Sequence, residues 1–221
     1  MTSFRGVLFD LDGTLLDTAP DLVYAFNQLR HDHDLPAMSL AELRPIISLG
    51  SKIMIKRLLG IDENSPHFNA LREKFLAVYE EHLADSTQFF PGIEEVLSHL
   101  DETQMPWGIV TNKLTRHTSA LLKALRIDHR PICVICGDSL PTFKPDPAPI
   151  LYACQLLQQD PKTCLYIGDS LTDVTASKAA GTASLVALYG YIGEEENPIA
   201  WAADGYIQQP IEIMKWIKSD R

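Results

Sequence analysis

"VLFDLDGTLLDT", residues 7–18, combines two features that conflict with each other. Residues 7–9 are apolar and predict a buried β-strand. Asp10 and Asp12 follow at once, with only Leu11 between them. Two carboxylates at the end of a buried strand repel each other and lose hydration. We interpret the arrangement as a site at which a bound cation offsets that cost.

Composition narrows the class of protein before any motif is considered. The chain has 221 residues, of which 46% are hydrophobic and 22% charged, as in ordinary soluble globular proteins. Its net charge of −10 disfavours nucleic acid as a partner. We find no apolar stretch of the roughly 18 residues that a membrane span needs, and no signal peptide. The expected location is therefore cytoplasmic, with no membrane partner.

Short apolar runs recur along the chain and predict the main fold. Five of them predict β-strands, at residues 6–9, 107–111, 132–136, 164–168 and 184–188. Each is apolar throughout, which is typical of a parallel sheet covered on both faces. Segments with helical spacing lie between the later strands, at residues 92–102, 115–127, 148–159 and 172–181. This alternation predicts an α/β fold with a doubly wound, Rossmann-like parallel sheet.

A helical insert interrupts the alternation after the first strand. Residues 17–87 show no convincing strand and several amphipathic helical segments, one of them starting near Ser65. Ser51 is the expected N-terminal cap of another. We therefore predict a helical cap domain at 17–87, and an α/β core made of 1–16 and 88–221.

Polar residues follow several of the predicted strands at the point where each strand ends. In open α/β sheets, ligands collect at the carboxyl ends of the strands. The residues at or just after these ends are Asp10, Asp12, Gly13, Thr111, Asn112, Lys113, Lys144, Asp169, Ser170 and Asp173. Mg²⁺ prefers oxygen ligands, so the expected ligands are the carboxylates of Asp10 and Asp169 with the backbone carbonyl of Asp12. Gly13 allows the chain to turn away sharply.

The ordered motifs resemble a known superfamily. "DLDGT" (10–14), "TNK" (111–113), "KP" (144–145) and "GDSLTD" (168–173) are similar to the four-part signature of the haloacid dehalogenase-like hydrolases. The likeness covers essentially the whole chain, and the helical insert resembles the small cap of the phosphoglycolate phosphatase branch. The tail at 189–204 is similar to a subgroup of that branch, once named phosphoglycolate phosphatase, whose members include the N-acetylmuramic acid 6-phosphate phosphatase.

The resemblance implies a role for each motif residue. Asp10 is the implied nucleophile and Asp12 the implied general acid and base. Thr111, Asn112 and Lys144 are the implied phosphate ligands. The implied Mg²⁺ ligands are Asp10, Asp12 and Asp169, supported by Gly13, Ser170 and Asp173.

The stretch "RPIISLGSK", residues 44–52, is a candidate substrate contact in the cap. Its candidate residues are Arg44, Ser48, Gly50, Ser51 and Lys52. One of the two cations is expected to meet a carboxylate on the leaving group. An ordinary polar loop with solvated basic residues is an equally good interpretation of the same stretch.

The predicted function is a Mg²⁺-dependent phosphomonoesterase that forms an aspartyl-phosphate. Its expected partner is a small acidic phosphate ester, either 2-phosphoglycolate or N-acetylmuramic acid 6-phosphate. A phosphotransfer mutase of the β-phosphoglucomutase type and a non-enzymatic binding module are the alternatives. The assembly is expected to be a monomer or a homodimer.

Overall fold

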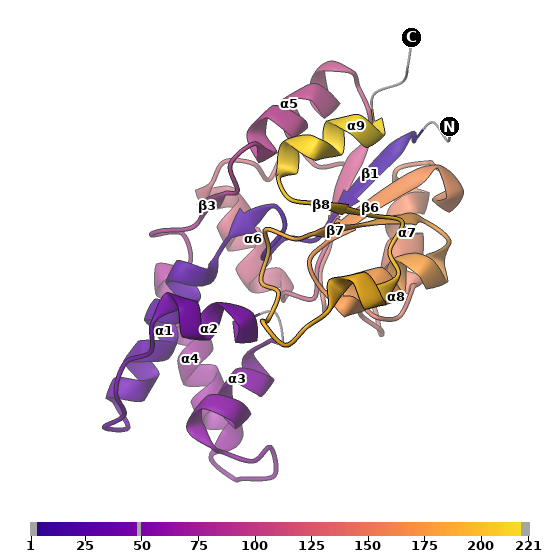
Figure 1. Ribbon diagram of the computed structural model, residues 1–221. Helices are drawn as coiled ribbons and strands as arrows, with labels where there is room; N and C mark the ends of the chain where they lie inside the picture. Colours follow the sequence, from indigo (N-terminus) through magenta and orange to yellow (C-terminus); the bar gives the residue numbers. More distant parts are fainter. Residues whose placement is uncertain (1–3, 48–49, 218–221) are drawn as a thin grey trace.

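A six-stranded parallel sheet forms the centre of the molecule (Figure 1). The computed structural model describes residues 4–47 and 50–217. The strand order is β5-β4-β1-β6-β7-β8. The strands are β1 (Gly6–Phe9), β4 (Trp107–Val110), β5 (Cys133–Ile135), β6 (Cys164–Gly168), β7 (Ala183–Ala187) and β8 (Gly205–Ile207). The five predicted strands and the doubly wound class are confirmed.

Helices cover both faces of the sheet, which explains why its strands are apolar throughout. Val7 and Phe9 of β1 pack in one buried cluster with side chains of α5, α6 and α9, whereas Leu8 packs in a second with α7 and α8. Figure 1 shows α5 and α9 on one side and α7 and α8 on the other. The bounds are α5 (Ile93–Glu102), α6 (Thr115–Ala124), α7 (Ala148–Leu156), α8 (Leu171–Ala180) and α9 (Met214–Ile217). Three short 3₁₀ segments are η1 (Pro161–Thr163), η2 (Pro198–Trp201) and η3 (Pro210–Ile213).

Strand β8 was not predicted. It contains only three residues and pairs with β7 in parallel, with Tyr206 opposite Val186. The run stands alone between Asp204 and Gln208, and so short an isolated run gives no periodicity to detect. It extends the sheet by one strand on the side away from β4.

Four helices between β1 and α5 form what we call the helical unit: α1 (Ala19–His31), α2 (Leu40–Ile47), α3 (Gly50–Leu59) and α4 (Phe68–His82). It lies beyond one end of the sheet (Figure 1). Its interior is apolar, with Phe26 of α1 packing edge-on against Phe75 of α4 at 5.8 Å between ring centroids. None of the helices among the described residues is both long and apolar enough to cross a bilayer.

The helical unit differs from prediction at its edge and at the starts of two of its helices. The chain enters and leaves it through a short antiparallel pair, β2 (Leu16–Asp17) with β3 (Gln88–Phe89), where no strand was predicted. Helix α3 begins at Gly50, so Ser51 lies inside it and is not its N-terminal cap. Helix α4 begins at Phe68, three residues after the predicted start. The division of the chain into two domains stays a prediction.

Candidate active site

A cavity of about 430 Å³ lies between the carboxyl ends of the central strands and the helical unit. The core contributes Asp10 after β1, Thr111 after β4 and Asp169 after β6. Parallel strands all end at the same edge, so these residues meet although they are distant in sequence. The predicted core residues that line the cavity are Asp10, Asp12, Thr111, Asn112, Lys113, Lys144, Asp169 and Ser170.

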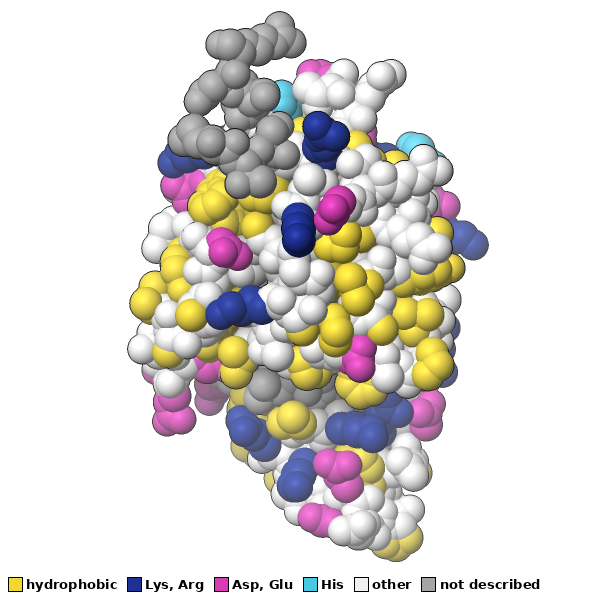
Figure 2. Space-filling view, turned by 90° about the vertical axis from the view of Figure 1, so that its right-hand side faces the viewer, with side chains coloured by type: hydrophobic (Ala, Val, Ile, Leu, Met, Phe, Trp, Pro, Cys, Tyr) yellow, Lys and Arg dark blue, Asp and Glu magenta, His cyan; other side chains and the backbone are white. Residues whose placement is uncertain are grey.

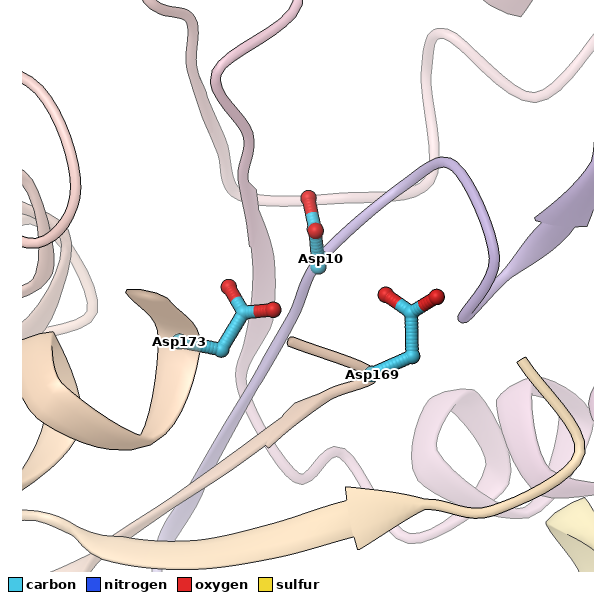
Figure 3. A group of neighbouring side chains, drawn as sticks. All are labelled: Asp10, Asp169 and Asp173. Carbon is cyan, nitrogen blue, oxygen red and sulfur yellow. The ribbon is translucent and has the colours of Figure 1, made fainter. Parts of the chain in front are cut away.

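Three acidic side chains converge at the floor of the cavity. Carboxylate oxygens of Asp10, Asp169 and Asp173 lie within 4.8 Å of one another. Figure 3 shows them gathered at the strand ends, with Asp173 reaching in from the first turn of α8. The backbone N–H of Tyr191 donates to Asp169 Oδ2 at 2.7 Å. Gly13 has a φ of 78° and lies against the Asp169 carboxylate, where a Cβ would collide with it.

The electrostatics of this cluster favour a bound cation. Burial raises the pKa of Asp10 to about 7, Lys144 lowers it in part, and Asp173 raises it further. Burial, followed by the charges of Asp10 and Asp173, raises the pKa of Asp169 well above its usual value. Buried acids that resist ionisation are the donor set that a hard divalent cation stabilises, because its charge offsets both desolvation and repulsion. The residues present therefore fit Mg²⁺.

Lys144 links two of the three acids. Its Nζ lies 3.0 Å from Asp10 Oδ1 and 2.6 Å from Asp173 Oδ1, and the side chain is almost completely buried. Burial acts to lower the pKa of Lys144, but the charges of Asp10 and Asp173 outweigh it, so the pKa lies above its usual value. Lys144 is thus a fixed cation beside the Asp10 carboxylate.

Asp173 is fully engaged by hydrogen bonds. Its Oδ1 accepts from Lys144 Nζ and from the Tyr166 hydroxyl, at 2.6 and 3.0 Å. Its Oδ2 accepts from the backbone N–H and the hydroxyl of Ser170, at 3.1 and 2.6 Å. Ser170 and Asp173 form the capping box that begins α8. This geometry suits Asp173 to holding Lys144 in place more than to binding a metal directly.

The side-chain amide of Asn112 holds the loop that carries Lys144. Its Nδ2 donates to the Lys144 carbonyl oxygen at 2.9 Å, and its Oδ1 accepts from the Lys144 backbone N–H at 3.0 Å. Both polar ends of the amide are therefore used within the protein. Phosphate binding by Asn112 stays a prediction.

Asp12 is held from two directions. Its Oδ1 accepts from the Thr18 hydroxyl at 2.6 Å and from Lys113 Nζ at 2.9 Å. Lys113 also donates to the Tyr79 hydroxyl at 2.8 Å, which connects the carboxylate to α4 of the helical unit. The Asp12 side chain therefore faces the cavity in one defined orientation, separate from the three-acid cluster.

The structure separates the candidate residues of the 44–52 stretch. Gly50, Ser51 and Lys52 line the cavity. Arg44 does not: its Nη2 lies 2.8 Å from Asp17 Oδ2, and its guanidinium lies over the Tyr191 ring at 5.3 Å. Ser48 lies outside the described residues. Arg44 therefore contacts Asp17 and Tyr191 and does not line the cavity.

Sequence reasoning missed several residues that line the cavity. They are Arg72, Phe75, Leu76, Tyr79, His117 and Phe143. A signal was present for those on α4, because Arg72, Phe75, Leu76 and Tyr79 recur at spacings of three and four and share one helical face. The segment was predicted only as an amphipathic helix, and no side chain on it was considered as part of the site. We find no sequence signal that marks His117 or Phe143.

Comparisons with known proteins agree with this geometry. A family model described as "Haloacid dehalogenase-like hydrolase" matches residues 7–187. The N-acetylmuramic acid 6-phosphate phosphatase of Pseudomonas putida is 38% identical over 215 residues, covering 97% of this chain and 96% of that protein. The phosphoglycolate phosphatase of Xanthomonas campestris pv. campestris is 38% identical over 209 residues, covering 95% and 94%. A crystal structure described as a predicted phosphoglycolate phosphatase from Haemophilus somnus has a TM-score of 0.87 at 31% identity, covering 99% of this chain and 100% of that one.

Proposed function

The chain belongs to the haloacid dehalogenase-like hydrolase family and is a phosphoric monoester hydrolase, and from this premise we propose that it works through a phosphorylated Asp10. The observation that carries the proposal is the position of Asp10. It lies beside the fixed cation Lys144 and next to the buried acid Asp169, at the floor of a cavity large enough for a substrate.

In the first half-reaction, a carboxylate oxygen of Asp10 attacks the phosphorus of the ester. A bond forms between that oxygen and phosphorus, and the bond between phosphorus and the leaving-group oxygen breaks. Asp12, in its protonated form, donates its proton to the leaving oxygen, so that an alcohol departs. Lys144 and Thr111 hold phosphoryl oxygens and offset the charge that develops on them.

In the second half-reaction, water replaces the alcohol. Asp12 is now a carboxylate and removes a proton from the water as it attacks phosphorus. The bond between phosphorus and Asp10 breaks, which releases inorganic phosphate and regenerates the Asp10 carboxylate. The contacts of Asp12 with Lys113 and Thr18 hold the side chain in position for both half-reactions.

The carboxylates of Asp10 and Asp169 are the residues that would hold Mg²⁺, with the backbone carbonyl of Asp12 as the further predicted ligand. Bound there, the ion supplies positive charge that favours ionised Asp10 and neutralises the phosphoryl group. Asp173 and Ser170 keep Lys144 in position, and Gly13 leaves room for the Asp169 carboxylate.

The proposed substrate is a small acidic phosphate ester, for which 2-phosphoglycolate and N-acetylmuramic acid 6-phosphate are the candidates named by the relatives. A cavity of about 430 Å³ falls in the range that takes ligands much larger than phosphoglycolate. Apolar side chains of the helical unit, including Ile47, Met54 and Phe75, offer surface to a sugar ring. These features favour N-acetylmuramic acid 6-phosphate, the sugar acid of the two candidates. Location in the cytoplasm and assembly as a monomer or homodimer stay predictions.

A phosphate-release assay over a panel of phosphorylated metabolites tests the proposal. The panel contains both candidates, other sugar phosphates and an aryl phosphate, each with Mg²⁺ and with EDTA. We expect steady release of inorganic phosphate, with the sugar acid as the better of the two candidates. A mutase would return the phosphoryl group to a sugar and release little phosphate, and a binding module would release none. Either result contradicts the proposal.

A further inference from the structure

The wall that the helical unit contributes to the cavity carries positive charge. Two basic side chains line it, Lys52 of α3 and Arg72 of α4. Among the described residues that line the cavity, every carboxylate comes from the core side. Figure 2, which shows the face on the right-hand side of Figure 1, has several Lys and Arg side chains on the smaller lobe, close to its junction with the larger one. The two walls of the cavity therefore differ in charge.

Arg72 differs from the basic residues of the core wall in its partners. Lys113 and Lys144 each lie within 3.0 Å of a carboxylate oxygen. Arg72 instead donates its Nε–H to the Ser51 hydroxyl at 3.0 Å, and its Nη1 lies 3.4 Å from the exposed carboxylate of Glu73. Within residues 4–47 and 50–217, no partner is recorded for its Nη2. Its charge is therefore less neutralised than that of Lys113 or Lys144.

The surroundings of Arg72 suit it to binding an anion. Its side chain is only 22% exposed, and Phe75 and Leu76 follow it on the same face of α4. A partly desolvated guanidinium forms strong paired hydrogen bonds with a carboxylate, since its planar fork matches the two oxygens. The bond to Ser51 fixes the plane of the fork in advance, which reduces the entropy lost on binding.

We propose that Arg72, oriented by Ser51, binds a carboxylate on the leaving-group part of the substrate and thereby selects acidic phosphate esters. This inference rests on the proposed phosphatase function and assigns its preference for acidic substrates to one residue. The phosphoryl group binds at the Asp10 and Lys144 end of the cavity, so the anion that reaches Arg72 is the second one on the substrate. Lys52 is more exposed and contributes attraction without a fixed geometry.

Two pairs of substrates isolate the carboxylate. N-acetylmuramic acid 6-phosphate differs from N-acetylglucosamine 6-phosphate by the lactyl ether that carries its carboxylate. Phosphoglycolate differs from ethyl phosphate by a carboxylate in place of a methyl group. kcat/KM is measured for all four with the wild type, Arg72→Gln, Arg72→Lys and Ser51→Ala. Arg57→Gln is the matched control, because Arg57 is exposed on α3 and does not line the cavity.

The wild type is expected to prefer the acidic member of at least one pair. Arg72→Gln should lower kcat/KM for that acidic member by about a hundredfold, chiefly through KM, because a charge-assisted paired contact is lost. It should change kcat/KM for the neutral member by less than about threefold. Arg72→Lys should recover part of the loss, Ser51→Ala should lose about fivefold on the acidic member alone, and Arg57→Gln should match the wild type.

The outcomes separate this inference from the proposed function. Equal losses on the acidic and neutral members would assign Arg72 a purely structural role and overturn the inference, as would no loss on either. Equal kcat/KM of the wild type on the neutral and the acidic member of both pairs would also overturn the inference. The phosphatase proposal would stay intact. Absence of phosphate release from every compound contradicts the proposed function itself. In that case, binding of phosphoglycolate and ethyl phosphate to the wild type and Arg72→Gln, measured by calorimetry, still decides whether Arg72 recognises the carboxylate.

Discussion

Lys113 and Tyr79 connect the helical unit to the catalytic edge of the sheet: Lys113 Nζ lies 2.8 Å from the Tyr79 hydroxyl oxygen and 2.9 Å from Asp12 Oδ1. Burial acts to lower the pKa of Lys113, but the charge of Asp12 and the hydrogen bonds to Tyr79 and Asp12 outweigh it, so the pKa is raised and the side chain stays cationic. His117, whose ring meets that of Tyr79 edge-on, has its pKa lowered to about 4 by burial and then by Lys113. Lys113 therefore lies between a carboxylate and two aromatic rings.

Removing the Tyr79 hydroxyl tests whether this connection serves the chemistry. Tyr79→Phe keeps the ring packing but leaves Lys113 without one of its two partners, so Asp12 is held less firmly. We expect kcat for alkyl phosphates to fall about tenfold, roughly 1.4 kcal/mol of barrier, while an activated aryl phosphate, which needs little proton donation, is nearly unaffected. Tyr206→Phe is the control, because that hydroxyl donates to the Ile199 carbonyl oxygen on the surface. Equal falls on both substrate classes would argue against this role.

Asp10→Asn tests the nucleophile. The amide keeps the shape of the carboxylate but is a far weaker nucleophile, so activity should fall at least about a thousandfold, roughly 4 kcal/mol. The measurement is steady-state phosphate release by protein whose folded state is verified by thermal unfolding. Turnover close to that of the wild type would rule out attack by Asp10.

Asp12→Ala tests the general acid. Loss of the proton donor should affect esters with poor leaving groups more than an activated aryl phosphate, by about tenfold or more. Both substrates are measured with the same preparation. A variant that loses activity equally on the two would show that Asp12 does not protonate the leaving group, although the role in activating water would remain open to a separate test.

The contrast between Asp10 and Arg72 shows which parts of this site the sequence predicts. Asp10, Thr111 and Asp169 directly follow apolar runs, so the rule that parallel strands end at one edge places them together without knowledge of any contact. Arg72 and Tyr79 approach the site only through the packing of α4 over the cavity. The Lys113 contact with Asp12 joins residues 101 positions apart. No periodicity encodes such a contact.

Arg44 illustrates the opposite error. It was considered as a substrate contact because it precedes a polar stretch in the predicted cap, and nearness in sequence was the only guide. Its actual partner, Asp17, lies 27 residues away in β2, where the two-residue strand was too short to predict. Most of the fold was predictable for the same reason that Asp10 was, since the buried strands are contiguous apolar runs. Strands β2, β3 and β8 were not, because each has only two or three residues and, unlike the equally short β5, none lies within a longer apolar run.

Arg44→Ala should therefore change stability more than specificity. The ion pair with Asp17 and the contact with the Tyr191 ring are half-buried, and together they contribute about 1 kcal/mol. For a chain of this size that corresponds to a fall in Tm of about 2–4 °C. Thermal unfolding measures the fall, and kcat/KM on the acidic substrates should change by less than about threefold. A large rise in KM with an unchanged Tm would restore Arg44 as a substrate contact.

Metal binding should stabilise the protein more at high pH than at low pH. The direction of this pH dependence follows from the pKa values of Asp10 and Asp169. The pKa of Asp10 is raised from 3.8 to about 7, chiefly by burial, and that of Asp169 is also raised. Without metal, the folded protein keeps protons that the unfolded chain has lost. Between pH 3.8 and about 7, Asp10 therefore makes the free energy of unfolding fall as pH rises, and the raised pKa of Asp169 acts in the same direction.

Mg²⁺ favours the ionised carboxylates and removes this penalty, so the gain in Tm on adding Mg²⁺ to EDTA-treated protein should be larger at about pH 8 than at about pH 5. At a hundred times Kd the gain is about 2.7 kcal/mol, or roughly 5–10 °C. Comparing each pH with and without Mg²⁺ cancels the opposite contribution of His117, whose lowered pKa makes stability rise with pH between about 4 and 6.5. Asp10→Asn and Asp169→Asn should each reduce the gain and its pH dependence, whereas the exposed Asp85→Asn should not. A gain that is the same at both pH values, or that survives both substitutions, would place the metal elsewhere.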